Sequence, residues 1–174
     1  ADEAVGGAIP KQFMGPIEKG VHQALEEGVI AGCPLQDVKV AVYDGKHHPV
    51  DSKEVAFITA GRRAFEDAVN KANPVLLEPV VEMEVTVPNE HMGDITSDLS
   101  GKRGRIQGTD MLPGDQAMIR ALVPLSEVSS YQSQLKSMTG GRGSYSMHFA
   151  EYAAVPAHVQ QQVVAEYQPA ARED

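Results

Sequence analysis

A pattern that occurs twice between residues 79 and 155 constrains the fold of this chain more than any other feature. Each copy has a strand-like run that ends in Val-Pro, then apolar residues at helical spacing, then a glycine-rich turn and another strand-like run. The copies match at three places: Val87-Pro88 with Val123-Pro124, Leu99 with Leu135, and Arg103-Gly104 with Arg142-Gly143. A strand, a helix and a strand in duplicate predict four strands and two helices.

The strand-like runs alternate between inward and outward positions, as in a sheet with one buried face. The inward positions of the first and last runs are Val81, Met83, Val85 and Val87, and then Tyr145, Met147 and Phe149. The helical runs place Met92, Ile95 and Leu99, and then Val128, Tyr131 and Leu135, on one side each. The order βαββαβ therefore predicts a ferredoxin-like sandwich, with two helices on one face of a four-stranded sheet.

Residues 1–78 form a separate βα unit in this interpretation, and residues 156–174 a C-terminal helix and tail, so the chain is α+β. A first helix follows Pro10 and ends at Gly28, and Leu35 to Tyr43 alternates like a strand. Asp51 or Ser52 is expected to cap a second helix that ends near Asn73-Pro74. The expected buried sides are Val38, Val40 and Val42 of the strand, Val55, Ile58, Phe65, Ala68 and Val69 of the second helix, and Val159, Val163 and Val164 of the last helix.

The charge of the chain limits its function, because 15 basic and 24 acidic residues give a net charge of −9. A protein that binds nucleic acid chiefly by coating phosphates would carry an excess of Lys and Arg. The single Cys33 excludes an internal disulfide and fits a reducing, cytoplasmic compartment. Apolar runs are too short for a membrane span, Asp2 and Glu3 do not suit a signal peptide, and Ala1 in place of Met indicates an excised or processed chain.

Catalytic, cofactor and metal sites are not predicted anywhere in the sequence. The glycine-rich turns at 101–104 and 140–144 lack the Lys-Ser/Thr order of a phosphate loop. Asp44, His48 and Ser52 lie within one short loop, which is unsuited to a hydrolase triad, and His47-His48 lacks a ligand set for a metal. Lys102, Arg103, Arg105, Arg120 and Arg142 are candidates for a basic patch, either as solubility charge or as a surface that contacts phosphates.

The order of motifs along nearly the whole chain resembles the C-terminal part of bacterial translation elongation factor G. The later half of its domain IV is similar to Gly6–Pro10, Val29–Pro34 and Val50–Ser52, and Ala72–Pro79 resembles the junction with domain V. Domain V is similar to Met92–Asp94, Arg103–Ile106, Val123–Glu127 and Gly141–Tyr145. The resemblance implies that residues 1–78 are a truncated domain IV and that 79–155 are domain V, which in this family is also ferredoxin-like.

The resemblance also implies which residues contact the ribosome. Gly45–Ser52 matches the tip loop of domain IV, which reaches the decoding centre, and His48 falls at the family's histidine. The expected tip residues are thus Gly45, Lys46, His47 and His48. Four members of the candidate basic patch are then the candidates for rRNA contact by domain V: Lys102, Arg103, Arg105 and Arg142. Lys46-His47 and Pro49 depart from the commoner tip residues, which leaves room for a paralogue with another preferred step.

The implied function is that of a translocase fragment, which contacts rRNA, tRNA and mRNA on the ribosome in the cytoplasm. The fragment is expected to be monomeric, without a membrane partner, a cofactor or enzymatic activity, whereas the full-length parent would use GTP and magnesium. Two alternatives stay open: a paralogue that acts mainly in ribosome recycling, and a ferredoxin-like regulatory module that binds a small ligand.

Overall fold

The computed structural model describes residues 9–48 and 53–167, which fall into two compact units. Unit 1 comprises residues 1–76 together with 156–174, and unit 2 comprises residues 77–155. Unit 2 is therefore inserted in the sequence of unit 1, since the chain passes to it after Leu76 and returns at Pro156. None of the described helices is both long and apolar enough to cross a membrane.

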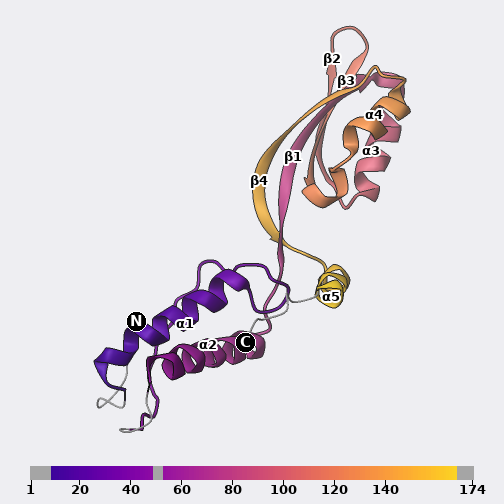
Figure 1. The fold of residues 1–174 in the computed structure, drawn as a ribbon. Coiled ribbons are helices and arrows are strands. Elements are labelled where there is room, and N and C mark those ends of the chain that lie inside the picture. The colour runs from indigo at the N-terminus through magenta and orange to yellow at the C-terminus, as the bar shows by residue number, and fades with distance from the viewer. Residues whose placement is uncertain (1–8, 49–52, 168–174) are drawn as a thin grey trace. The chain divides into compact units, whose positions relative to one another are not determined.

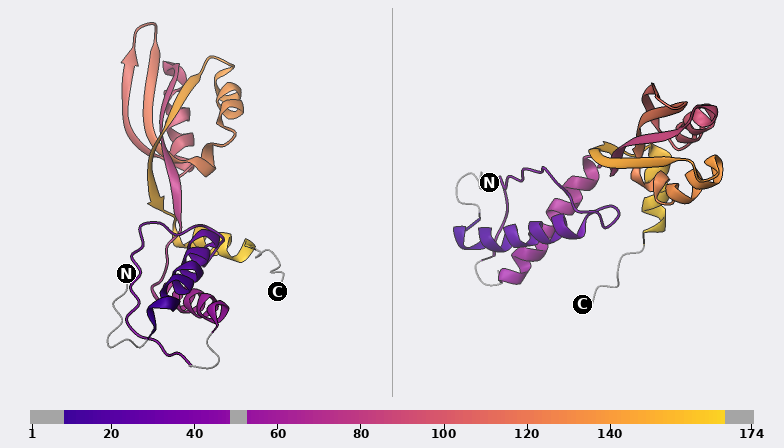
Figure 2. Two further views of the ribbon diagram at one scale, coloured as in Figure 1. Left: turned by 60° about the vertical axis from the view of Figure 1, so that its left-hand side comes forward. Right: turned by 90° about the horizontal axis from the view of Figure 1, so that it is seen from above.

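Unit 2 confirms the sandwich that the repeat predicts (Figure 1). Its elements are β1 (Leu77–Pro88), η3 (Asn89–His91), α3 (Met92–Gly101), β2 (Arg105–Leu112), β3 (Gln116–Pro124), η4 (Leu125–Val128), α4 (Tyr131–Thr139) and β4 (Ser144–Ala154). The strands form one antiparallel sheet in the order β2-β3-β1-β4. Both views of Figure 2 show α3 and α4 on the same face of this sheet.

The core of unit 2 lies between the sheet and its two helices. The predicted positions of β1 and the helices are buried except for Met92, which is partly buried and packs against the core. The buried positions are Val81, Met83, Val85, Val87, Ile95, Leu99, Val128, Tyr131 and Leu135. Tyr145 and Met147 pack against this core, but Phe149 leaves 60% of its surface exposed. The hydroxyl of Tyr131 is buried without a hydrogen-bond partner among the described residues, and burial raises the pKa of this group.

Unit 1 is built on two helices, α1 (Met14–Glu27) and α2 (Glu54–Lys71), which pack against each other (Figure 1). The short helix η2 (Lys11–Phe13) precedes α1, and α5 (Ala157–Glu166) completes the unit. Gly28 ends α1 as predicted, with a φ of 77°. Lys53 is the N-cap of α2, and the predicted caps Asp51 and Ser52 lie outside the described residues.

The strand predicted from Leu35 to Tyr43 is wrong. This segment is extended, yet Val42 is its only bridge residue, because no described strand of unit 1 lies beside it to complete a ladder. Val40 and Val42 pack against the helices as the alternation implies, whereas Val38 is 45% exposed. A strand pattern records which side chains are apolar and says nothing of whether a neighbouring strand is present.

The buried side predicted for α2 is partly wrong. Val55 and Ala68 are exposed, and the buried positions are Phe57, Gly61 and Phe65. The glycines explain this choice, because they bring the two helix backbones close together. A Cβ on Gly20 of α1 would lie 2.0 Å from the carbonyl oxygen of Ile58, and one on Gly61 would lie 2.8 Å from that of Ile17.

Gly20→Ala is therefore expected to lower the free energy of unfolding of unit 1 by about 2 kcal/mol or more, because backbone atoms of α2 must move away. Gly15→Ala is the matched control on the same helix, since a Cβ there meets no atom within 4 Å. Helix propensity favours Ala over Gly by about 1 kcal/mol, but Pro16 opposes this because it disfavours helical backbone for a preceding residue with a Cβ. The net change in stability should therefore be smaller than about 1 kcal/mol. Urea unfolding followed by far-ultraviolet circular dichroism measures both, and equal effects of the two substitutions would contradict this account of the helix pair.

Candidate nucleic-acid interface

The predicted tip residues lie at the end of the extended segment that follows α1. Lys46, His47 and His48 are exposed, and Gly45 is half-buried. Asp44 fixes the turn, because its Oδ1 accepts a hydrogen bond from the Gly45 N–H at 2.7 Å. A Cβ on Gly45 would lie 2.4 Å from Cδ1 of Ile9, so a larger residue at this position requires the Ile9 side chain to move. The remaining positions of the matched run, 49–52, lie outside the described residues.

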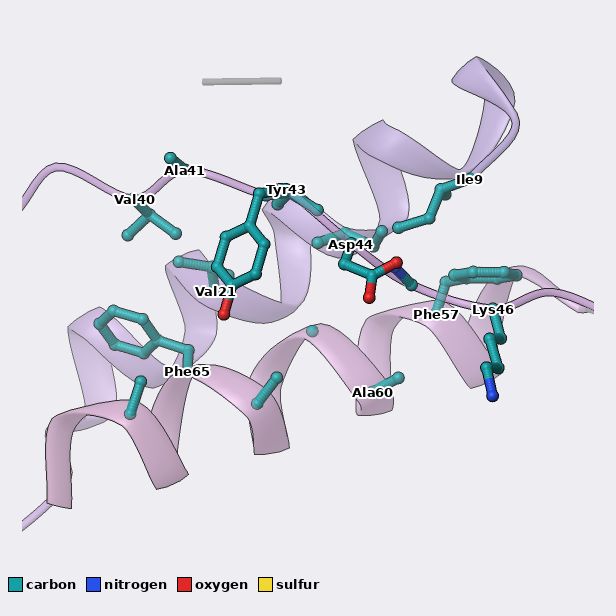
Figure 3. A pocket seen from close by; sticks show the side chains of 16 residues that line it. Ile9, Val21, Val40, Ala41, Tyr43, Asp44, Lys46, Phe57, Ala60 and Phe65 are labelled. Carbon is teal, nitrogen blue, oxygen red and sulfur yellow. The ribbon is translucent and has the colours of Figure 1, made fainter. Parts of the chain in front are cut away.

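Tyr43 precedes this turn and was not among the residues that the sequence singled out. Its side chain is 74% exposed, and Figure 3 shows the ring projecting from the extended segment toward α2. Exposed aromatic rings provide stacking surfaces for the bases of single-stranded nucleic acid. The sequence offered only one indication of this role, which is an aromatic residue three positions before Lys46.

A groove of about 400 Å³ separates residues 40–46 from α2 (Figure 3). Its lining is mostly apolar, including Phe57, Ala60 and Phe65 of α2, and its charged members are Asp44 and Lys46. The described residues that line the groove include no histidine, cysteine or serine. Asp44 and Lys46 therefore have no such side chain in the groove with which to form a catalytic pair of nucleophile and base. Nor do three or more His, Cys, Asp or Glu side chains gather around a possible metal position anywhere in the described ranges.

Arg103 and Arg142 occupy the two turns of unit 2 that lead from a helix into a strand, whereas Arg120 lies within β3 and pairs with Asp110 at 2.7 Å. Arg103 lies between α3 and β2, in a left-handed conformation with a φ of 57°. Its Nη1 and Nη2 donate to the two carboxylate oxygens of Glu78, and its Nε donates to Glu127 at 2.8 Å. These bonds, the one to Glu78 foremost, raise the pKa of Arg103 above its usual range. Arg103 therefore ties the start of β1 and η4 to the end of α3.

The other three predicted RNA contacts also have carboxylate partners. Lys102 donates to Asp98 one turn earlier in α3, and this pair is largely shielded from solvent. Arg105 pairs with Glu151 of β4 at 3.1 Å, and both side chains are more than half exposed. Arg142 donates to Glu90 at 2.6 Å and contacts His91, and this hydrogen bond lowers the pKa of Glu90.

The structure does not gather these basic residues into one patch. Arg103 binds Glu78 near the start of β1, whereas Arg142 binds Glu90 just after its end. At about 3.3 Å per residue, the twelve residues of β1 span roughly 40 Å. The two equivalent turns of the repeat, which carry Arg103 and Arg142, lie at opposite ends of β1. The reason is that β1 runs antiparallel to both strands of the second half, β3 and β4. In the sequence, the excess of acidic over basic residues was the one indication that these basic side chains would pair with carboxylates.

Comparison with known proteins gives matches to both units. Residues 1–73 match the family described as elongation factor G, domain IV, and residues 75–163 match the family described as elongation factor G C-terminus. A crystal structure of a protein from Thermus thermophilus is similar with a TM-score of 0.74 and 42% sequence identity. The match covers 95% of this chain and 25% of that one, so this chain spans a quarter of that protein's length.

Arg103→Ala is expected to lower the free energy of unfolding of unit 2 by about 2 kcal/mol, since it leaves two carboxylates without their shared cation. Glu78 is only 13% exposed and Arg103 25%, so solvent screens this pair weakly. Arg105→Ala is the matched control, and its exposed pair should contribute less than about 0.5 kcal/mol. Urea unfolding of both variants tests the difference, and a loss for Arg105→Ala as large as that for Arg103→Ala would be inconsistent with it.

Proposed function

This chain belongs to the elongation factor G family, and we propose that it is the C-terminal, ribosome-contacting part of a translocase that helps to move tRNA and mRNA during protein synthesis. The observation that carries the proposal is the succession of two matches, domain IV and then the C-terminus of the factor, along one chain. Both matched regions are non-GTPase parts of the factor. We therefore assign GTP hydrolysis, with its magnesium ion, to the longer protein.

The tip residues are suited to RNA in the decoding centre. Lys46 offers a mobile positive charge to phosphate, and the exposed His47 and His48 can hydrogen-bond ribose or phosphate or stack on a base. Tyr43 adds an exposed ring close by in the sequence. The adjoining groove is apolar, which supports a role for this end of unit 1 in binding and positioning rather than in catalysis.

Arg105 and Arg142 are better candidates for rRNA contact than Lys102 and Arg103. Their carboxylate partners are exposed, so a phosphate can replace the carboxylate with little loss. Lys102 and Arg103 are more enclosed by their partners, and this supports a structural role for them. Because the chain has a net charge of −9, we assign most of the electrostatic affinity for the ribosome to other parts of the factor.

The proposed partners are the rRNA of both subunits and the tRNA and mRNA at the decoding centre. The proposal places the protein in the cytoplasm, as a monomer before it binds, and gives this part of it no cofactor or membrane partner. Ribosome recycling by a related factor is the second candidate, because Lys46 and His47 depart from the commoner tip residues.

Replacing Lys46, His47 and His48 together by Ala in the full-length factor is expected to slow single-turnover translocation at least about tenfold, as removal of several polar contacts would do. GTP hydrolysis on the ribosome should stay unchanged, because the substituted residues lie outside the GTPase domain. Rapid-mixing measurements of mRNA movement and of phosphate release provide the two rates.

Lys39→Ala is the matched control for this experiment, because Lys39 is an exposed lysine on the same extended segment outside the tip turn. It should leave translocation unchanged. If the triple variant also translocates at the normal rate, the tip assignment fails. Slower splitting of post-termination ribosomes by that variant would then favour the recycling factor.

A further inference from the structure

The last helix of unit 1, α5, has little apolar burial to hold it in place. All ten of its residues are at least partly exposed, and Val163 and Val164 each leave 40% of their surface open. An isolated helix of this length is marginal in water. Specific contacts with the rest of unit 1 must therefore hold α5 in place.

Gln160 makes the most specific of these contacts. The Leu76 N–H donates to Oε1 of Gln160 at 3.0 Å, and Nε2 of Gln160 donates to the carbonyl oxygen of Pro74 at 3.0 Å. The side-chain amide thus binds one donor and one acceptor of the backbone, as a paired strand would. Leu76 is only 8% exposed, so its N–H depends on this partner.

Tyr167 makes the second contact, at the C-terminal end of α5. Its N–H closes the helix on the carbonyl oxygen of Val163, and its ring lies against Gly32. A Cβ on Gly32 would be 2.6 Å from Cε2 of that ring. Two contacts therefore hold the helix. The amide of Gln160 binds the backbone of residues 74–76, and the ring of Tyr167 packs against Gly32.

The contact between Gln160 and residues 74–76 lies at the point in unit 1 where the chain leaves for unit 2 and returns from it. Residues 74–76 are the last of unit 1 before the chain passes to unit 2, and α5 begins directly after the chain returns at Pro156. The outgoing and returning strands pair with each other, Leu77 with Ala154. Gln160 therefore connects the last residues of unit 1 before the chain enters unit 2 with the helix that begins just after the chain returns.

We propose that α5 is a latch on residues 74–76, closed by Gln160, that opens while the cores of the two units stay folded. Opening transfers the Leu76 N–H and the Pro74 carbonyl to water and loosens the segment that leads into β1. It also uncovers Val29 and Ile30, which line a shallow depression together with Gln160 and Val164. The latch is a property of the chain that is independent of its role in translation.

Hydrogen exchange of individual amides in the 174-residue chain tests the latch. Gln160→Ala is expected to speed exchange of the Leu76 amide about tenfold, the effect of losing one hydrogen bond of ordinary strength. Amides of α5 should exchange faster as well, whereas those of Val85 and Ile119 in the core of unit 2 should not change. Gln162→Ala is the matched control, because Gln162 lies on the same helix, is exposed and does not line the depression.

Gln160→Glu separates the two hydrogen bonds. It keeps an oxygen for the Leu76 N–H and removes the donor to Pro74, so exchange at Leu76 should lie between that of the parent and that of Gln160→Ala. Equal exchange at Leu76 in Gln160→Ala and Gln162→Ala would overturn the proposal. In the unsubstituted chain, rising urea should leave exchange of the α5 amides almost constant while that of the core amides accelerates; exchange of both sets by one common unfolding would also overturn it.

Discussion

The pairing of β1 on both of its edges is the constraint on which unit 2 depends. This strand pairs with β3 over Val80–Pro88 and with β4 over Leu77–Thr86, and its inward side chains form the centre of the core. Its register also positions charge, since Glu78 lies near its start and Glu90 just beyond its end. Each carboxylate binds an arginine from a helix-to-strand turn, and the more enclosed pair of Glu78 and Arg103 ties that turn to the strand.

The electrostatics of the chain follow from the same arrangement. Carboxylates pair with Lys102 and with the arginines of unit 2, and the exposure of each pair then separates structural pairs from exchangeable ones. In unit 1, the tip presents Lys46 and two exposed histidines after a turn in which Asp44 accepts a hydrogen bond from the Gly45 N–H. The proposed translocase part thus positions a few polar groups on folded supports and leaves most of the affinity to the rest of the factor.

The sequence predicted features that depend on local periodicity and failed where a distant partner decides. The repeat specified the sandwich because Val81 to Val87, Leu99 and Leu135 each occupy a face that must be buried. Leu35 to Tyr43 has the same alternation but no described strand beside it. The Arg103–Glu78 pair and the Gln160 contacts join residues 25 and more than 80 positions apart, and no spacing rule indicates them. The assignment of the tip rests on family resemblance, because exposed histidines have no periodic signature.

Site-specific photocrosslinking from position 47 is the measurement that tests the central claim most directly. A photoreactive residue replaces His47 in the full-length factor, which is then trapped on ribosomes that carry tRNA and mRNA. If this chain is the ribosome-contacting part of a translocase, the crosslinks should fall on small-subunit rRNA, tRNA or mRNA at the decoding centre. Crosslinks confined to the large subunit, or no more than a probe at position 39 gives, would contradict the account.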